Sequence, residues 1–341
     1  MTTRSFSNAF EVVDQTQALK IIPNAWTLLG DTGLFKEESL SQNTVTFQEQ
    51  KGVLNFYGDM VRGARPQTQL NETRRIHSYV LPHFPTVDAI YPQDVQGKAA
   101  YADLNTPDTT DAVLARKMEK IKRGYAVTKE LARFKTLTTG AAYAPNGTVV
   151  ANFYTDFGIT RTEVDFVLGT ATTDIVGKVE SVIADLQDKS QNGEVITSVV
   201  AYCSPEFFAA LISHAKVVAA YQYYSATAQQ SIMRNRAGGM ESGLYRQFDY
   251  AGVRFIEVRT SFNGSRLIPA KDAYFVAQGV DDAFVTYYGP ANRFGYENTI
   301  AETEYLWTFK DPRATEITIE GESNFLNVLR KPQLVIRGFT A

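Results

Sequence analysis

Residues 108–137 read DTTDAVLARKMEKIKRGYAVTKELARFKTL, and this stretch sets the architecture because it predicts one long helix. Asp108-Thr109-Thr110-Asp111 supplies side chains that cap a helix N-terminus. Apolar and small residues then recur at steps of three and four, as one helix face requires: Leu114, Met118, Ile121, Tyr125, Thr128 and Ala132. Gly140 should end the helix near Leu137, and Asn146-Gly147 predicts a hairpin just beyond it.

The opposite face of this helix is basic, and one glycine lies in its middle. Arg116, Lys117, Lys120, Lys122 and Arg123 favour a solvated face, or else a surface that meets an acidic partner or a nucleic acid backbone. A glycine inside a helix costs about 1 kcal/mol relative to alanine. We therefore predict a bend point at Gly124.

The sequence before the helix is extended. The first forty residues show no sustained helical period, which indicates an arm. Between residues 45 and 107, Pro66, Pro82, Pro85 and Pro92 exclude a continuous helix and interrupt any central strand. The same segment is rich in aromatic and aliphatic side chains. We predict a projecting, strand-like loop whose apolar side chains are poorly buried within their own chain and make few contacts beyond Gly140.

The sequence after the long helix alternates between helices and strands, so the fold class is α+β. Residues 174–189 carry a helical apolar stripe, and residues 195–202 form a predicted buried strand. Ser204-Pro205-Glu206 then caps a helix that continues to about Val218. Residues 221–247 are irregular. Further strands are predicted at 252–258, 273–277, 283–288, 304–309, 316–320 and 334–337.

Composition excludes several classes of protein. The formal net charge is −3, whereas a protein that binds nucleic acid or an anionic membrane through its overall charge would be strongly positive. No run approaches the roughly 18 apolar residues of a membrane span. The aromatic content, with 18 Tyr and 21 Phe, suits sheets and association surfaces.

Catalytic and metal sites find little support in the residue pattern. Cys203 precedes a capped helix N-terminus, where a thiol can be activated, but His214 would lie on the order of 15 Å along that helix. His77 and His83 have no zinc-ligand spacing, and Gly238-Gly239 lacks the rest of a phosphate-binding loop. We expect no catalytic residue, no metal site and no cofactor.

Several stretches together resemble the major capsid proteins of lambda-like tailed bacteriophages, the phage major capsid protein E family with the Hong Kong 97 type fold. They are Val80-Leu81-Pro82-His83-Phe84-Pro85, Asp94-Val95-Gln96-Gly97, the long helix, Val199 to Phe208, Ile268 to Ala273, Tyr287 to Ala291, and Trp307 with Lys310-Asp311-Pro312-Arg313. The resemblance covers essentially the whole chain.

The resemblance implies a division of the chain into parts. The N-terminal arm would span 1–44 and the extended loop 45–107. The peripheral domain, with the long helix as its spine, would take 108–172 and 283–341, and the axial domain 173–282. Inter-subunit contacts are expected at Phe47, Phe56, Tyr57, Phe84, Ile90 and Tyr91, and a loop at the capsomer centre at Arg234, Arg236, Gly238 and Gly239.

The implied function is a structural subunit that assembles with itself into hexamers and pentamers of an icosahedral shell. Expected partners beyond itself are scaffolding, portal and decoration proteins and, without specificity, packaged double-stranded DNA. The protein would reside in the virion after assembly in the host bacterial cytoplasm. Two other hypotheses stay open from the sequence: a cysteine-dependent enzyme, and another self-assembling phage protein such as a tube or sheath subunit.

Overall fold

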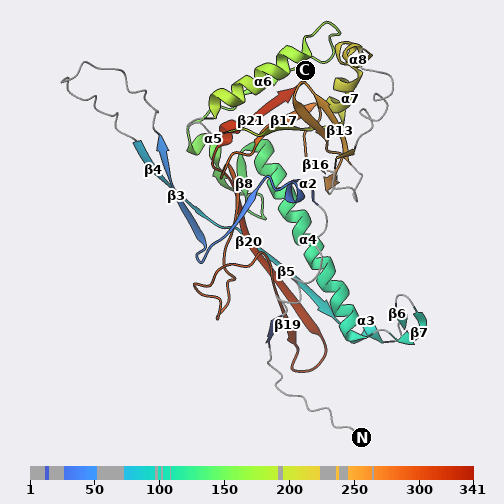
Figure 1. Cartoon of the computed structure of the whole chain (residues 1–341). Coiled ribbons are helices and arrows are strands. Elements are labelled where there is room, and N and C mark those ends of the chain that lie inside the picture. The colour runs from blue at the N-terminus through green and yellow to red at the C-terminus, as the bar shows by residue number, and fades with distance from the viewer. Residues whose placement is uncertain are drawn as a thin grey trace, which may run out of the picture.

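A computed structural model of the chain describes residues 12–14, 27–51, 73–96, 99–100, 103–107, 109–190, 195–222, 236–237, 245–262 and 265–341. A six-stranded sheet packs along the long helix α4 (Thr110–Thr139), and a seven-stranded sheet lies at the C-terminal end of this helix, with a hairpin projecting to one side (Figure 1). The mixture of helices and two sheets agrees with the predicted α+β class.

Helix α4 spans Thr110–Thr139 and confirms the predicted long helix. The Thr109 hydroxyl accepts a hydrogen bond from Ala112 N at 3.2 Å, and Gly140 ends the helix with a left-handed φ of 71°. The helix continues unbroken through Gly124, so the bend at Gly124 stays a prediction about other states of the protein. Beyond Gly140, the predicted hairpin forms from β8 (Ala141–Tyr143) and β9 (Val149–Asn152).

The six-stranded sheet, which we call the peripheral sheet, has the strand order β1-β19-β20-β18-β2, and β5 also pairs with β20. Ile90, Ile319 and Leu306 of this sheet pack against Met118 and Ile121 of α4. The strands are β1 (Val12–Asp14), β2 (Lys36–Ser39), β5 (His83–Ile90), β18 (Phe284–Tyr288), β19 (Tyr305–Lys310) and β20 (Ile317–Leu329). Segments far apart in the sequence therefore meet on one sheet.

The seven-stranded sheet, which we call the axial sheet, has the strand order β10-β21-β17-β11-β14-β13-β12. Its strands are β10 (Glu163–Asp165), β11 (Ser198–Cys203), β12 (Arg236–Ala237), β13 (Tyr245–Tyr250), β14 (Val253–Glu257), β17 (Asp272–Gln278) and β21 (Val335–Phe339). The helices α6 (Ile175–Lys189), α7 (Pro205–Ser213) and α8 (Ala215–Gln222) accompany it. Ser204 Oγ caps α7 by accepting from Phe207 N, as predicted.

The expected boundaries between the peripheral and axial parts need a correction. Strands β10 and β21 fall within the ranges assigned to the peripheral part, yet both belong to the axial sheet. β21 pairs with β17 from Asp272↔Phe339 to Val276↔Val335. Leu334, Val335 and Ile336 are buried there, because the chain returns to the axial core after β20.

Short elements fill the connections. They are the helices α2 (Leu28–Asp31), α3 (Pro92–Val95), α5 (Phe153–Asp156) and the 3-10 turn η2 (Pro332–Leu334), and the paired strands β3 (Thr44–Lys51) with β4 (Thr73–Val80), β6 (Ala99–Ala100) with β7 (Asp103–Pro107), and β15 (Ser261–Phe262) with β16 (Ser265–Arg266). The β3–β4 hairpin projects to the left of the body in Figure 1.

The expectation that residues 45–107 contact little beyond Gly140 is wrong for both the β3–β4 hairpin and β5. In the hairpin, the Tyr79 hydroxyl donates a hydrogen bond to Asp156 Oδ2 at 2.8 Å, and the His77 ring lies against Phe157. β5 pairs with β20 along its whole length, from His83↔Asn324 to Ile90↔Ile317. Pro85 is tolerated because β5 pairs with β20 alone among the described strands, and an edge strand can lack one N–H donor. The arm is likewise attached, since Leu28, Leu29 and Phe35 are buried.

Candidate functional site

Cys203, the one position where nucleophilic chemistry was considered, is sealed in the axial core. The residue is 0% exposed, and its thiol donates a hydrogen bond to Ala201 O at 3.5 Å. Burial, with a smaller contribution from the charge of Glu257, raises the pKa of the Cys203 thiol well above its ordinary value. A thiol held protonated and out of solvent cannot attack a substrate.

The histidines are used in packing and hydrogen bonding. The His77 ring lies edge-on against Phe157 at 4.8 Å, and His83 Nδ1 lies 2.8 Å from Asn324 Oδ1. The buried His214 places Nε2 2.9 Å from Thr170 O. Within the described ranges, no three His, Cys, Asp or Glu side chains gather as metal ligands, and no helix there is long and apolar enough to cross a membrane.

The predicted contact residues divide according to their burial. Phe47 packs against Tyr79 and Phe157 of the same chain, with ring centroids 5.8 and 6.1 Å away. Phe84 stacks on Phe325 at 4.4 Å, and Ile90 is 3% exposed in the core beneath α4. The expectation of poor burial is therefore wrong for these three. Tyr91 is exposed, as expected, at 44%.

A row of exposed aliphatic side chains follows the β4–β5 ribbon. Ile76 and Val80 share the outer face of β4, since they lie four residues apart on a strand, and Val87 follows on β5. They are 68%, 64% and 67% exposed, whereas Val45 and Tyr79 on the inner face are buried. We call Ile76, Val80, Val87 and Tyr91 the ribbon surface.

Several predicted residues lie outside the described part of the chain. These are Phe56 and Tyr57, in the sequence between β3 and β4, and Arg234, Gly238 and Gly239, which were expected at the capsomer centre. The backbone of Arg236 is described and pairs with Arg246 in the β12–β13 ladder.

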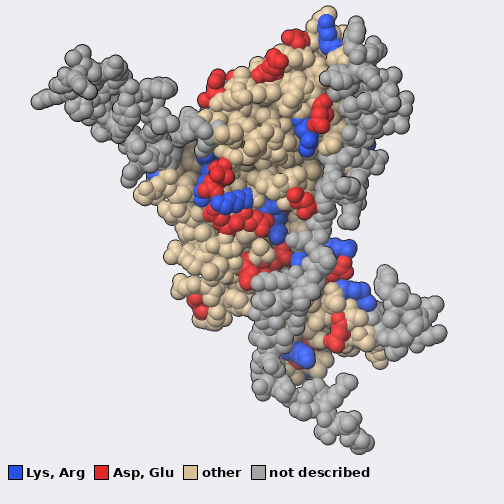
Figure 2. Space-filling view, viewed as in Figure 1, with Lys and Arg blue, Asp and Glu red and all other residues tan. Residues whose placement is uncertain are grey.

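The charged face of α4 is more structured than the sequence indicated. Lys122 was placed on the solvated face but is buried, and desolvation lowers the pKa of its ammonium group. Lys117 pairs with Asp88 on β5 at 2.7 Å, while Arg123 pairs with Glu119 on the helix surface. Figure 2 shows acidic and basic side chains intermixed on the visible face, without a broad patch of one sign.

A second set of charged residues on α4, which sequence reasoning missed, ties the arm to the body. Glu130 accepts a hydrogen bond from Leu29 N at 2.8 Å, and burial raises the pKa of its carboxyl. The guanidinium of Arg133 lies 2.7 Å from Glu37 Oε1 on β2 and 5.6 Å from the ring centre of Phe35. Helical spacing gave no signal for these pairs because their partners come from distant parts of the chain.

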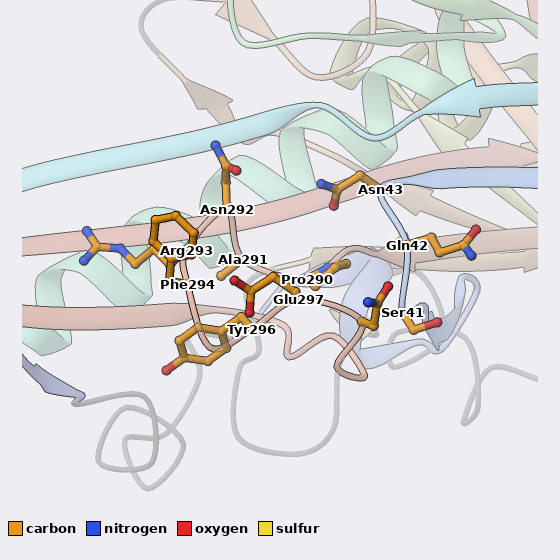
Figure 3. Close-up of a pocket in the computed structure, with 11 residues that line it drawn as sticks. Ser41, Gln42, Asn43, Pro290, Ala291, Asn292, Arg293, Phe294, Tyr296 and Glu297 are labelled. Carbon is orange, nitrogen blue, oxygen red and sulfur yellow. The ribbon is translucent and has the colours of Figure 1, made fainter.

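Sequence reasoning also missed a hollow of about 480 Å³ between the start of β3 and the loop that follows β18. Its lining residues are Ser41, Gln42, Asn43, Pro290, Ala291, Asn292, Arg293, Phe294, Tyr296, Glu297 and Asn298. Figure 3 shows Ser41, Gln42 and Asn43 on one side and Arg293, Phe294 and Tyr296 toward the other. Phe294 on this loop is 100% exposed.

The described residues thus form two large sheets, a long helix and a projecting hairpin. The chain matches the family described as Phage major capsid protein E over residues 11–340. It belongs to this family. A relative, the major capsid protein of Pseudomonas phage KPP10, is 40% identical and matches over 99% of both chains. The major capsid protein of Salmonella phage Felix O1 is 26% identical over 98% of both chains.

Solved structures of capsid proteins show the fold of this phage major capsid protein E family member. The putative capsid protein of a prophage from E. coli CFT073 superposes with a TM-score of 0.56 at 10% identity, covering 97% of this chain and all of that one. The capsid protein of cyanophage P-SCSP1u gives a TM-score of 0.53 at 10% identity, covering 100% and 93%. The chain therefore has the Hong Kong 97 type capsid fold. Its membership of the family gives its role, that of a structural protein of the phage capsid.

Proposed function

We propose that this chain builds the icosahedral shell of a phage head by assembling with itself into hexamers and pentamers, and that it has no catalytic activity. The single observation that carries the proposal is the ribbon surface of Ile76, Val80, Val87 and Tyr91, which lies exposed along a projecting hairpin and its continuation. Exposed apolar surface on an extended element is typical of a surface that another chain covers.

The proposed contact between subunits uses the outer face of the hairpin. Phe47, Phe84 and Ile90 already have partners in their own chain, so we place the contact on the ribbon surface instead. Phe56 and Tyr57 belong to the sequence that joins β3 to β4 and stay predicted contacts. Fully burying one aliphatic side chain contributes roughly 1.5–3 kcal/mol, so several together stabilise a shell contact substantially.

The remaining assignments follow the family. We place the axial segment with Arg234, Arg236, Gly238 and Gly239 at the capsomer centre. We propose scaffolding, portal and decoration proteins as further partners, packaged double-stranded DNA as a non-specific neighbour, and the host bacterial cytoplasm as the place of assembly. The intermixed charges of Figure 2 support contacts without a strongly basic surface on that face.

Particle shape tests the proposal. Expressed protein, viewed by negative-stain microscopy, should form closed shells of uniform diameter. The double variant Ile76→Ser/Val80→Ser should remain as unassembled subunits, because it removes two exposed apolar contacts without touching the core. Val195→Ser is the matched control, since Val195 is also exposed, at 74%, but lies away from β4. Open tubes from the wild type would instead support a tube or sheath protein.

A further inference from the structure

The loop between β18 and β19 is held rigidly on both sides of Phe294. The Arg293 guanidinium lies 4.1 Å from the ring centre of Trp307 and pairs with Glu320. On the other side, Tyr296 packs edge-on against Trp307 at 5.7 Å, and its hydroxyl accepts a hydrogen bond from Trp307 Nε1 at 3.3 Å. Aromatic and cation-π contacts of this kind fix geometry as well as adding stability.

Phe294 points away from this anchored base. It is 100% exposed although its sequence neighbours Arg293 and Tyr296 are both packed on the sheet. Gly295 has a φ of +93°, a conformation open to glycine, and turns the chain between the two anchors. A phenylalanine that is fully exposed on a preorganised loop has no use in the fold of its own chain, and such a residue is suited to anchoring an interface.

The hollow beside Phe294 has the features of a site that binds an anchor side chain from another protein surface. Pro290 and Ala291 are buried at its base, whereas Ser41, Gln42 and Asn43 are exposed around it. An apolar base within a polar rim is the usual arrangement around an anchor residue at a protein interface. In Figure 3 the projecting ring and the hollow lie next to each other on one surface.

We infer that Phe294 anchors a contact between neighbouring copies of this chain by entering the hollow bordered by Ser41, Gln42 and Asn43 on the adjacent copy. A projection and a hollow side by side form a self-complementary surface, so copies related by a rotation axis can each give and receive one side chain. The second copy is the occupant because the chain is a capsid protein, and a shell brings many identical surfaces together. The inference rests on the proposed shell-building function.

Site-directed crosslinking within assembled particles tests the contact. Cys203 is buried, so the wild-type chain should give little background with a short thiol-to-thiol crosslinker. Chains carrying Phe294→Cys and chains carrying Gln42→Cys are co-expressed, and particles are isolated before crosslinking. We expect a covalent dimer that contains one chain of each kind. Intact particles that give no dimer, or that give dimers of Phe294→Cys chains with each other alone, would overturn the inference.

Assembly measurements supply a second readout. Phe294→Ala should raise the protein concentration needed for particle formation by about tenfold or more, as expected for the loss of one buried aromatic side chain. Phe294→Leu should restore most of the assembly, because it keeps an apolar anchor. Normal assembly of Phe294→Ala would contradict the inference while leaving the shell-building function intact. Failure of the wild type to form shells would instead contradict the proposed function.

Discussion

Lys129 Nζ lies 2.6 Å from Glu304 Oε1 inside the molecule, joining the middle of α4 to the chain just before β19. The two side chains are 10% and 4% exposed. Removing one member of a buried pair leaves an uncompensated charge, which costs roughly 3–5 kcal/mol, whereas replacing both by apolar residues can be nearly neutral. The pair therefore fixes where the spine helix sits on the peripheral sheet.

Glu304→Gln should lower the free energy of unfolding by roughly 3–5 kcal/mol, because Lys129 and the neighbouring buried Lys122 lose the carboxylate that offsets their charge. Denaturant unfolding of unassembled subunits measures this. The double variant Lys129→Met/Glu304→Leu should recover most of the loss. A single variant as stable as the wild type would contradict a role for the ion pair.

Arg133→Met should loosen the arm without unfolding the body. The substitution removes the ion pair to Glu37 and the contact with Phe35, both of which hold β2 beside β18. Limited digestion with trypsin, read by mass spectrometry, should show faster cleavage after Lys36. Arg123→Met is the matched control, since Arg123 pairs with Glu119 on the exposed face of the same helix. Equal cleavage rates in the two variants would refute the prediction.

Glu130→Gln should change how stability depends on pH. Burial raises the folded-state pKa of Glu130 above its ordinary value of 4.5, and one carboxyl oxygen has no hydrogen-bond partner. Protonated Glu130 therefore makes its full contribution to the free energy of unfolding below about pH 4.5, and this contribution is lost as the pH rises through the folded-state pKa. The amide keeps an acceptor for Leu29 N without this loss.

The stability gained by Glu130→Gln over the wild type should therefore grow between about pH 4.5 and neutrality. Unfolding midpoints measured across that range check it. Glu119→Gln, at the surface of the same helix, should show no such trend. A difference that is constant with pH would mean that the folded-state pKa of Glu130 is not raised.

Local signals in the sequence predicted the elements that depend on local physics. Each of these signals lies within a few residues of the feature it predicts. They are the helix cap at Thr109, the left-handed helix end at Gly140 and the turn at Asn146-Gly147. The pairing of β20 with β5 and β18 could not be predicted from such local signals. Residues Ile317 to Asn324 of β20 pair with residues of β5 more than two hundred positions earlier, so the partners of this strand depend on the whole fold.

The candidate sites show the same limit. The sequence identified an extended, apolar segment, but not that Phe84 would stack on Phe325 while Val87 stayed exposed. Burial of a side chain depends on which neighbour the other strand supplies. Phe294 was missed because Phe294 and Tyr296 stand in an irregular loop whose sequence shows no period that would indicate which of the two side chains is buried.

Cys203 should resist thiol reagents in the native protein and react once the chain is unfolded. Its complete burial and its raised pKa both reduce the fraction of accessible thiolate. Labelling with a chromogenic disulfide reagent, in the presence and absence of denaturant, measures the two rates. Rapid labelling of the native protein, or loss of an enzymatic activity on alkylation, would reopen the hypothesis of a cysteine-dependent enzyme.

Substitution by alanine should have opposite effects at Gly124, inside helix α4, and at Gly140, which caps the C-terminus of that helix. A Cβ at Gly124 meets nothing within 4 Å, so Gly124→Ala should raise the free energy of unfolding by about 0.5–1 kcal/mol. A Cβ at Gly140 would lie 2.1 Å from the Tyr154 ring at a φ of +71°. Gly140→Ala should lower the free energy of unfolding by more than about 1 kcal/mol, measured by denaturant unfolding.

The same Gly124→Ala variant tests the bend proposed for the spine helix. The structure has room for the methyl group, so any defect in the shell must come from a stiffer helix and not from a clash. If the helix bends at Gly124 when an assembled shell converts to its final diameter, the variant should assemble at normal protein concentration but complete this conversion more slowly, which microscopy over time can follow. Arg123→Ala, one residue earlier and exposed, controls for a substitution on the same turn. Conversion at the wild-type rate by the more stable variant would show that the helix acts as a rigid rod at this position.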